Sequence, residues 1–208
     1  MSREVHVRFC EGLGVRLPRS THLVVGFQRN WEAERFLGDL KTRLAKFHLE
    51  LHPDKTRLIE FGRFAAENRA RRGKGKPETF SFLGFTHIRG TTQAGRPTLW
   101  CHTERKRMRS KLHAVKADLR RRMHQPIPVV GRWLASILRG HYNYYGVTYN
   151  SRALGAFRYF VGRLWYWALR RRSQRKTLNW ARMARLVEKW LPPARVVRTV
   201  FSQMQLPL

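Results

Sequence analysis

The sequence predicts an α+β protein in which a region of strands and one helix precedes a bundle of helices. Up to residue 102, apolar residues alternate or run together in short segments, as they do in strands. From Thr103 onward they recur every three to four residues, which is the helical period. The chain has 208 residues, of which 42% are hydrophobic, so it can bury one large core or two small ones.

The first region is predicted to be a β-α-β unit followed by a β-hairpin. Residues 1–21 combine Gly, Pro and Arg like a loop, so the apolar strand at 23–27 has no evident partner before it. A helix is expected after Asn30, and a second strand is expected at 56–64. The basic, Gly-rich residues 67–78 are predicted to be a flexible loop, and the segments "TFSFLGFTHIRG" and "RPTLWCHT" to form a hairpin around "TTQAG".

The second region is predicted to hold four helices. The first covers residues 103–125 and ends before a proline, because proline clashes with a continuing helix. The others cover residues 129–142, the segment after Asn150 or Ser151, and the segment from Thr177 to the next pair of prolines. The apolar stripes of the first and third helices are Met108, Leu112, Val115, Leu119 and Met123, and Leu154, Phe157, Val161, Leu164, Trp165 and Ala168.

The charge of the chain is strongly unbalanced. It has 43 Lys and Arg against 13 Asp and Glu, a net charge of +30, which attracts polyanions such as RNA and DNA. Two runs of cations stand out, and they contain almost no acids, whereas a solvated helix face normally mixes both signs. We therefore expect these runs to bind phosphates, with a solvated face as the alternative: Arg105, Lys106, Arg107, Arg109 and Lys111, and Arg170, Arg171, Arg172, Arg175 and Lys176.

The aromatic residues allow two interpretations. Tyr142, Tyr144 and Tyr145 in "RGHYNYYGV" could stack on nucleobases, or they could be core residues with the hydroxyl at the edge. The tryptophans lie mostly on apolar stripes and are interpreted as packing residues.

Several classes of protein are disfavoured. No segment approaches the roughly 20 apolar residues of a membrane span, and the N-terminus lacks the apolar core of a signal peptide. The two cysteines, Cys10 and Cys101, are far apart and the histidines are scattered, so no metal site is expected. We expect a cytoplasmic protein, because unpaired cysteines favour a reducing compartment.

Several long segments resemble the bacterial group II intron reverse transcriptase/maturase family. They are "FLGDLKTRLAKFHLELHPDKTRLIEFGRFA", "GKPETFSFLGFTH", "KRMRSKLHAVKADLRRRMHQPI", "RGHYNYYGV" and "LWYWALRRRSQR", and they span most of the chain. The resemblance implies a divergent or loop-like N-terminus at 1–21, the last part of a reverse transcriptase palm at 22–102, a helical thumb at 103–191 and an irregular tail at 192–208. This thumb is the maturase-specific domain, also called domain X.

The catalytic residues of the family are not matched here. In the family, "VVGFQ" follows Tyr-Ala-Asp-Asp-Phe, whose two aspartates hold the magnesium ions for RNA-directed DNA polymerisation. Thr21 and His22 occupy the positions of these aspartates and offer no carboxylate to Mg²⁺. We therefore expect no catalytic residue, no metal and no cofactor in the chain by itself, and magnesium only if another chain completed the palm.

Two further motifs of the family survive. Lys55 in "HPDKT" resembles the lysine near the phosphates of the incoming nucleotide, and a solvent-exposed turn lysine is the alternative interpretation. Phe82, Leu83, Gly84 and Phe85 resemble the primer grip.

The resemblance implies a truncated maturase of this class of mobile element, which binds group II intron RNA, and possibly DNA as a second polyanion, and assists RNA splicing without polymerase activity. One alternative is the C-terminal piece of a split RNA-directed DNA polymerase, completed by another chain. The other is a gene remnant without function. The oligomeric state is left open.

Overall fold

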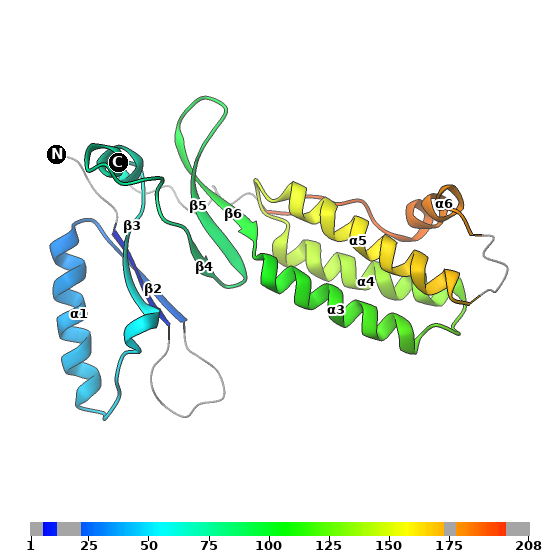
Figure 1. Cartoon of the computed structure of the whole chain (residues 1–208), viewed down its shortest axis with the longest axis horizontal. Coiled ribbons are helices and arrows are strands. Elements are labelled where there is room, and N and C mark those ends of the chain that lie inside the picture. Colours follow the sequence, from blue (N-terminus) through cyan, green and yellow to red (C-terminus); the bar gives the residue numbers. More distant parts are fainter. Residues whose placement is uncertain (1–5, 12–21, 173–177, 199–208) are drawn as a thin grey trace. The chain divides into compact units, whose positions relative to one another are not determined.

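The computed structural model describes residues 6–11, 22–172 and 178–198, and the chain divides into two compact units at Trp100 and Cys101 (Figure 1). The first unit contains two α-helices and the strands except for the last three residues of the final strand, and the second unit is otherwise helical. The predicted α+β class is thereby confirmed. No helix in the described ranges combines the length and the hydropathy needed to cross a bilayer.

The first sheet has the strand order β2-β1-β3 and is antiparallel. Its strands are β1 (His6–Glu11), β2 (His22–Phe27) and β3 (Thr56–Glu60), and helix α1 (Asn30–Ala45) packs against β1 and β2. The order β2, α1, β3 confirms the predicted β-α-β unit, although β3 ends four residues before the predicted boundary.

Strand β1 corrects the prediction for the N-terminus. The sequence predicted a loop over 1–21 and no partner for the strand at 23–27. The loop prediction is wrong at residues 6–11, and the second prediction is wrong as well, because β1 pairs with β2 and with β3. The rest of 1–21 lies outside the described residues. A six-residue strand gives only a short alternating pattern, and its pairing with two long-range partners cannot be seen in local sequence.

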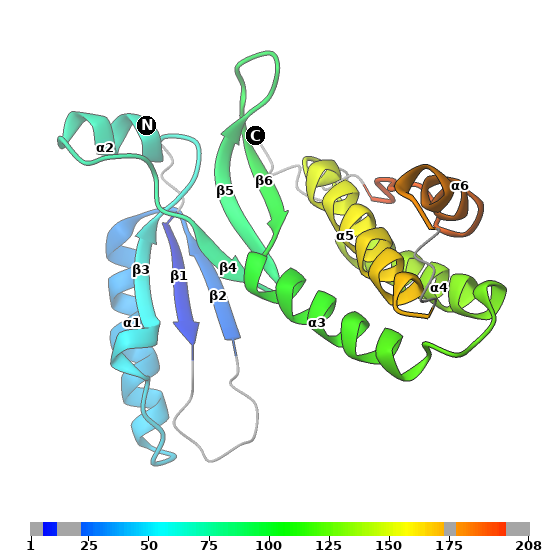
Figure 2. The same ribbon diagram turned by 45° about the vertical axis from the view of Figure 1, so that its right-hand side comes forward.

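The loop predicted at 67–78 is also partly wrong, because helix α2 (Ala65–Arg71) covers its first residues (Figure 2). Alanines favour this helix. Glu60 of β3 accepts hydrogen bonds from Asn68 at 3.0 Å and from Arg72 at 3.3 Å, which ties the helix to the sheet.

The second sheet has the order β4-β5-β6 and contains the predicted hairpin. Its strands are β4 (Phe80–Phe82), β5 (Phe85–Thr91) and β6 (Pro97–Thr103). Gly90 of β5 is required by packing, since an added Cβ would lie 2.3 Å from the ring of Trp100.

The helical unit consists of α3 (Arg105–Arg121), α4 (Ile127–Tyr145), α5 (Ser151–Arg170) and α6 (Trp180–Trp190). Helix α5 packs against α3, α4 and α6, and α6 lies on the side of the bundle away from α3 (Figures 1 and 2). Members of the predicted apolar stripes form one core, whose largest fully buried side chains include Trp165, Phe157, Leu134 and Leu138. Helix α6 approaches α4 closely at Gly131, where a Cβ would lie 2.7 Å from Trp190.

Asn150 joins the three segments that meet at one end of the helical unit. Its side chain is fully buried, and its oxygen accepts the backbone N–H of Thr103 at 2.9 Å. Its amide nitrogen donates to Thr103 Oγ1 at 2.8 Å and to the carbonyl of Tyr145 at 2.7 Å. The start of α3, the end of α4 and the start of α5 are therefore linked through one side chain.

Candidate nucleic-acid interface

Positive charge is concentrated in the helical unit. Residues 101–208 contain 24 of the 43 Lys and Arg but only 3 of the 13 Asp and Glu. Helix α3 begins with Arg105, Lys106 and Arg107 and has no acidic residue in its first turn. Cations at a helix N-terminus oppose the helix dipole, so stability alone does not favour this arrangement.

Helix α3 exposes its cations on both sides of its buried stripe. Val115 and Leu119 face the core, while the neighbouring positions on one side line a groove against α5. The α3/α5 groove has a volume of about 430 Å³, and an adjoining hollow of about 190 Å³ continues it toward the helix C-termini. The residues that line the groove and its continuation are Arg109, Leu112, His113, Lys116, Leu119 and Arg120 of α3 with Met123 after its end, and Phe160, Arg163, Leu164, Trp167 and Ala168 of α5 with Arg171 after its end.

The cations of the α3/α5 groove are not neutralised by acids. The lining contains no Asp or Glu. In the described part of the chain, Arg109, Lys116 and Arg120 have no carboxylate within 4.0 Å, and the ion pairs of α3 are Arg107 with Glu104 and Arg121 with Asp118. The groove therefore presents uncompensated positive charge to an anionic ligand.

Aromatic rings lie among these cations. Trp167 is 48% exposed and Phe160 is 43% exposed. The guanidinium of Arg170 lies 5.5 Å from the centre of the Trp167 ring and 5.6 Å from that of Tyr166. The interpretation of the tryptophans as packing residues is thus wrong for Trp167, and also for the exposed Trp31 and Trp180, whereas Trp165 is fully buried.

A second groove lies between α3 and α4 and has a volume of about 460 Å³. Arg107 and Lys111 line it from α3, one helical turn apart, and Tyr144 lines it from α4. Tyr144 is 50% exposed, whereas Tyr142 is buried and donates its hydroxyl to the carbonyl of Pro192 at 3.2 Å. Of the three tyrosines singled out in the sequence, Tyr144 is the one placed to stack on a base.

His141 is buried at the base of the α3/α4 groove. Its ring stacks on Phe157 with centroids 3.8 Å apart, and its Nε2 atom has no hydrogen-bond partner within the described residues. Burial, with a smaller contribution from the charge of Lys111, lowers the pKa of His141 to about 4. The imidazole is therefore neutral at pH 7.

This lowered pKa predicts that acid destabilises the helical unit. In the unfolded chain the His141 pKa is about 6.5, so the unfolded state binds the proton first as pH falls. The free energy of unfolding should therefore fall between pH 6.5 and pH 4, by about 3 kcal/mol in total. Urea unfolding at a series of pH values measures this fall. His141→Phe should remove most of it, and the exposed control His113→Gln should retain it; an unchanged pH profile in His141→Phe would contradict the assignment.

The two predicted cation clusters lie at opposite ends of the helical unit. Arg105 to Lys111 start α3, whereas Arg170 ends α5 and Arg171 and Arg172 follow it, and α3 and α5 run in the same direction. Arg109 lines the α3/α5 groove, Arg171 lines its continuation, and Arg172 donates to the carbonyl of Gln125. Arg175 and Lys176 lie outside the described residues.

Residues that the sequence interpretation missed lie between these clusters. Lys116 and Arg120 on α3 and Arg163 on α5 line the groove and connect its two ends. The spacing of Arg109, Lys116 and Arg120 by seven and four residues places them on one face of a helix, and this pattern could have identified them.

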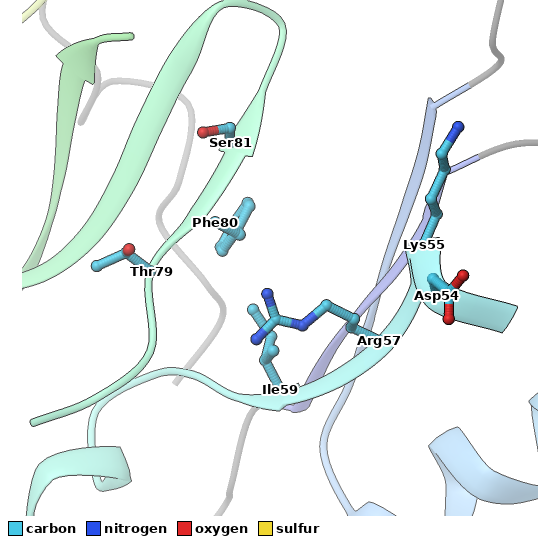
Figure 3. A pocket seen from close by; sticks show the side chains of 7 residues that line it. All are labelled: Asp54, Lys55, Arg57, Ile59, Thr79, Phe80 and Ser81. Atoms are coloured by element: carbon cyan, nitrogen blue, oxygen red, sulfur yellow. The ribbon is translucent and has the colours of Figure 1, made fainter. Parts of the chain in front are cut away.

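In the first unit, Lys55 is exposed at the end of a short 3₁₀ turn, Pro53–Lys55. It lines a hollow of about 320 Å³ with Arg57 and Ser81, and Figure 3 shows its side chain extending away from Arg57. Arg57 is paired with Glu78 at 2.8 Å, so this hollow is less cationic than the grooves of the helical unit.

The other residues implied by the resemblance lie at the hairpin of β4 and β5 and at the start of β2. Phe82 and Phe85 are paired, and Leu83 and Gly84 form the tight turn between β4 and β5 with φ values of 49° and 79°. Both values are positive, as a two-residue hairpin turn of type I′ requires. Thr21 lies outside the described residues, and His22 is the first residue of β2. The roles of these residues as a primer grip and as replacements of the catalytic aspartates stay predictions.

Among the described residues, no three His, Cys, Asp or Glu side chains are grouped as a metal site would require. The expectation that the chain by itself uses no metal or cofactor stays a prediction.

Comparison with known families identifies the helical unit. Residues 105–186 match the family described as group II intron, maturase-specific domain. The matched segment runs from the first residue of α3 into α6 and includes both grooves. No curated protein matches the chain. The resemblance seen in the sequence is confirmed over these residues: the chain carries a group II intron maturase-specific domain, which indicates a maturase-related role in group II intron splicing.

Proposed function

We propose that the helical unit binds group II intron RNA and stabilises its folded form for splicing. The observation that carries the proposal is that the segment matching the maturase-specific domain is also the segment with the two cationic grooves. Arginine and lysine that neutralise phosphates release condensed counterions, and this release favours RNA binding. Stabilising the folded RNA in this way needs no nucleophile from the protein. The intron RNA would supply the chemistry of splicing.

The contributing residues divide by groove. Arg107 and Lys111 would contact phosphates in the α3/α4 groove, and Arg109, Lys116, Arg120, Arg163 and Arg171 would contact them in the α3/α5 groove.

A filter-binding assay with group II intron RNA across a salt series tests the proposal. If each of these seven side chains neutralises a phosphate, the logarithm of the association constant should fall with the logarithm of salt concentration with a slope of about −5 to −6. An unrelated protein of equal net charge is the control. Binding that ignores salt, or that is no tighter than the control's, would contradict a maturase function.

We further propose that the first unit derives from a reverse transcriptase palm and that the chain by itself does not polymerise DNA. The support is the sequence resemblance of residues 22–102 and the presence of Thr21 and His22 where the family has aspartates. Primer extension with magnesium should give no product. Product formation that is lost when one of the chain's acidic residues is changed to its amide would reverse this part of the proposal.

A further inference from the structure

The α3/α5 groove contains exposed aromatic rings as well as cations. A site that binds only the phosphates of RNA needs the cations but not the rings. Phe160 and Trp167 are seven residues apart on α5, two helical turns, with Leu164 between them on the same face. Both rings are more than 40% exposed, although burying them would be favourable. A ligand with an apolar planar surface would cover them.

We propose that the α3/α5 groove binds one unpaired nucleobase of the RNA, stacked on Trp167, while Arg109, Lys116 and Arg163 hold the phosphates on either side. The proposal rests on the proposed function, namely that the helical unit binds RNA. It adds a preference for a bulged or looped nucleotide over a continuous duplex.

The environment of Trp167 favours stacking. The guanidinium of Arg170, 5.5 Å from the ring centre, can cover only one of the two ring faces. This cation–π contact restricts the indole, so less side-chain entropy is lost when a base stacks on it. Stacking on an aromatic side chain accepts any base, because every base has a π face.

The chemistry of the groove favours a nucleotide over other ligands. Its volume of about 430 Å³ is in the usual range for a small-ligand site, and its apolar lining includes Leu112 and Leu164. A base inside an RNA helix is already stacked on both faces, so only an unpaired base can enter. A nucleotide carries phosphates on both sides of its base, which matches cations on both helices that bound the groove: Arg109 and Lys116 on α3, and Arg163 on α5.

The test uses the full chain and two RNA hairpins with equal numbers of phosphates. One hairpin has a single 2-aminopurine bulge, and the other is fully paired. Wild-type protein should bind the bulged hairpin about 5-fold to 150-fold more tightly and quench the 2-aminopurine fluorescence. Trp167→Leu should lose this preference and the quenching but bind the paired hairpin as wild type does, and Trp167→Phe should retain part of the preference.

Trp31→Leu is the matched control, since Trp31 is 53% exposed but lies in the first unit. It should behave as wild type, and circular dichroism should show equal helix content for all variants. Equal affinity of wild type for the two hairpins, or an unchanged preference in Trp167→Leu, would overturn the inference and leave RNA binding intact. Salt-independent binding of both hairpins would instead overturn the proposed function as well.

Discussion

Replacing Arg109, Lys116 and Arg120 together by glutamine is expected to weaken RNA binding about 100-fold at 0.15 M salt. All three side chains are exposed on one face of α3, and none has a carboxylate within 4.0 Å in the described part of the chain. Each phosphate contact contributes about 0.7 to 0.9 to the salt slope, so three lost contacts should reduce the slope by about 2 to 3. If the variant and the wild type bind RNA equally at 1 M salt, this difference in slope makes the affinity of the variant about two orders of magnitude lower at 0.15 M salt.

The matched control removes the same charge from the other unit. Arg35, Lys41 and Arg43 are exposed on α1, and their triple glutamine variant lowers the net charge by the same amount. We expect its affinity to stay within about threefold of wild type, because long-range attraction is screened beyond roughly 8 Å at this ionic strength. Filter binding across a salt series measures both variants. Equal losses in the two would mean that total charge, and not the face of α3, determines RNA binding.

The helices of the second unit could be predicted well, because the spacing of apolar residues along one helix is visible within a short stretch of sequence. The stripe Val115 and Leu119 on α3 and the stripe Leu154, Phe157 and Val161 on α5 are all buried, as their spacing predicted. Strand β1 could not be predicted, since its stability depends on pairing with β2 and β3, and β3 lies about 50 residues away along the chain. Helix boundaries shifted by a few residues, as for α4, which begins at Ile127 and ends at Tyr145.

The candidate site could be predicted only in part, for a related reason. Runs of adjacent cations are visible in sequence, so Arg105 to Lys111 and Arg170 to Arg172 were identified. A groove is formed by residues from two helices, and Lys116 and Arg163 come together only when α3 packs along α5. Trp167 illustrates the same limit: it lies two residues from the buried Trp165, and only the packing of α5 decides which of the two indoles faces solvent.

Replacing Asn150 by alanine is expected to destabilise the helical unit by about 4 kcal/mol. The change removes three hydrogen bonds and leaves the buried N–H of Thr103 without its partner, whereas the carbonyl of Tyr145 still accepts the N–H of Val147 at 2.8 Å. A buried polar group left unpaired costs about 1 to 3 kcal/mol, and each of the other two lost hydrogen bonds contributes about 1 kcal/mol. Urea unfolding followed by the helical circular dichroism signal measures the loss. Asn143→Ala is the control, since Asn143 is exposed on α4, and its effect should stay within about 0.5 kcal/mol.

The same substitution connects stability to binding. Asn150 fixes Thr103 immediately before α3, so its loss should release the helix end that carries Arg105, Lys106 and Arg107. We expect faster amide exchange in the first turns of α3 for Asn150→Ala, and weaker RNA binding at temperatures where the wild type is fully folded. Thr103→Val, which removes only the hydroxyl acceptor, should show a smaller effect of about 1 kcal/mol. If Asn150→Ala destabilised the unit no more than Asn143→Ala, the buried amide would contribute no net stability, and the position of α3 would depend on the apolar core alone.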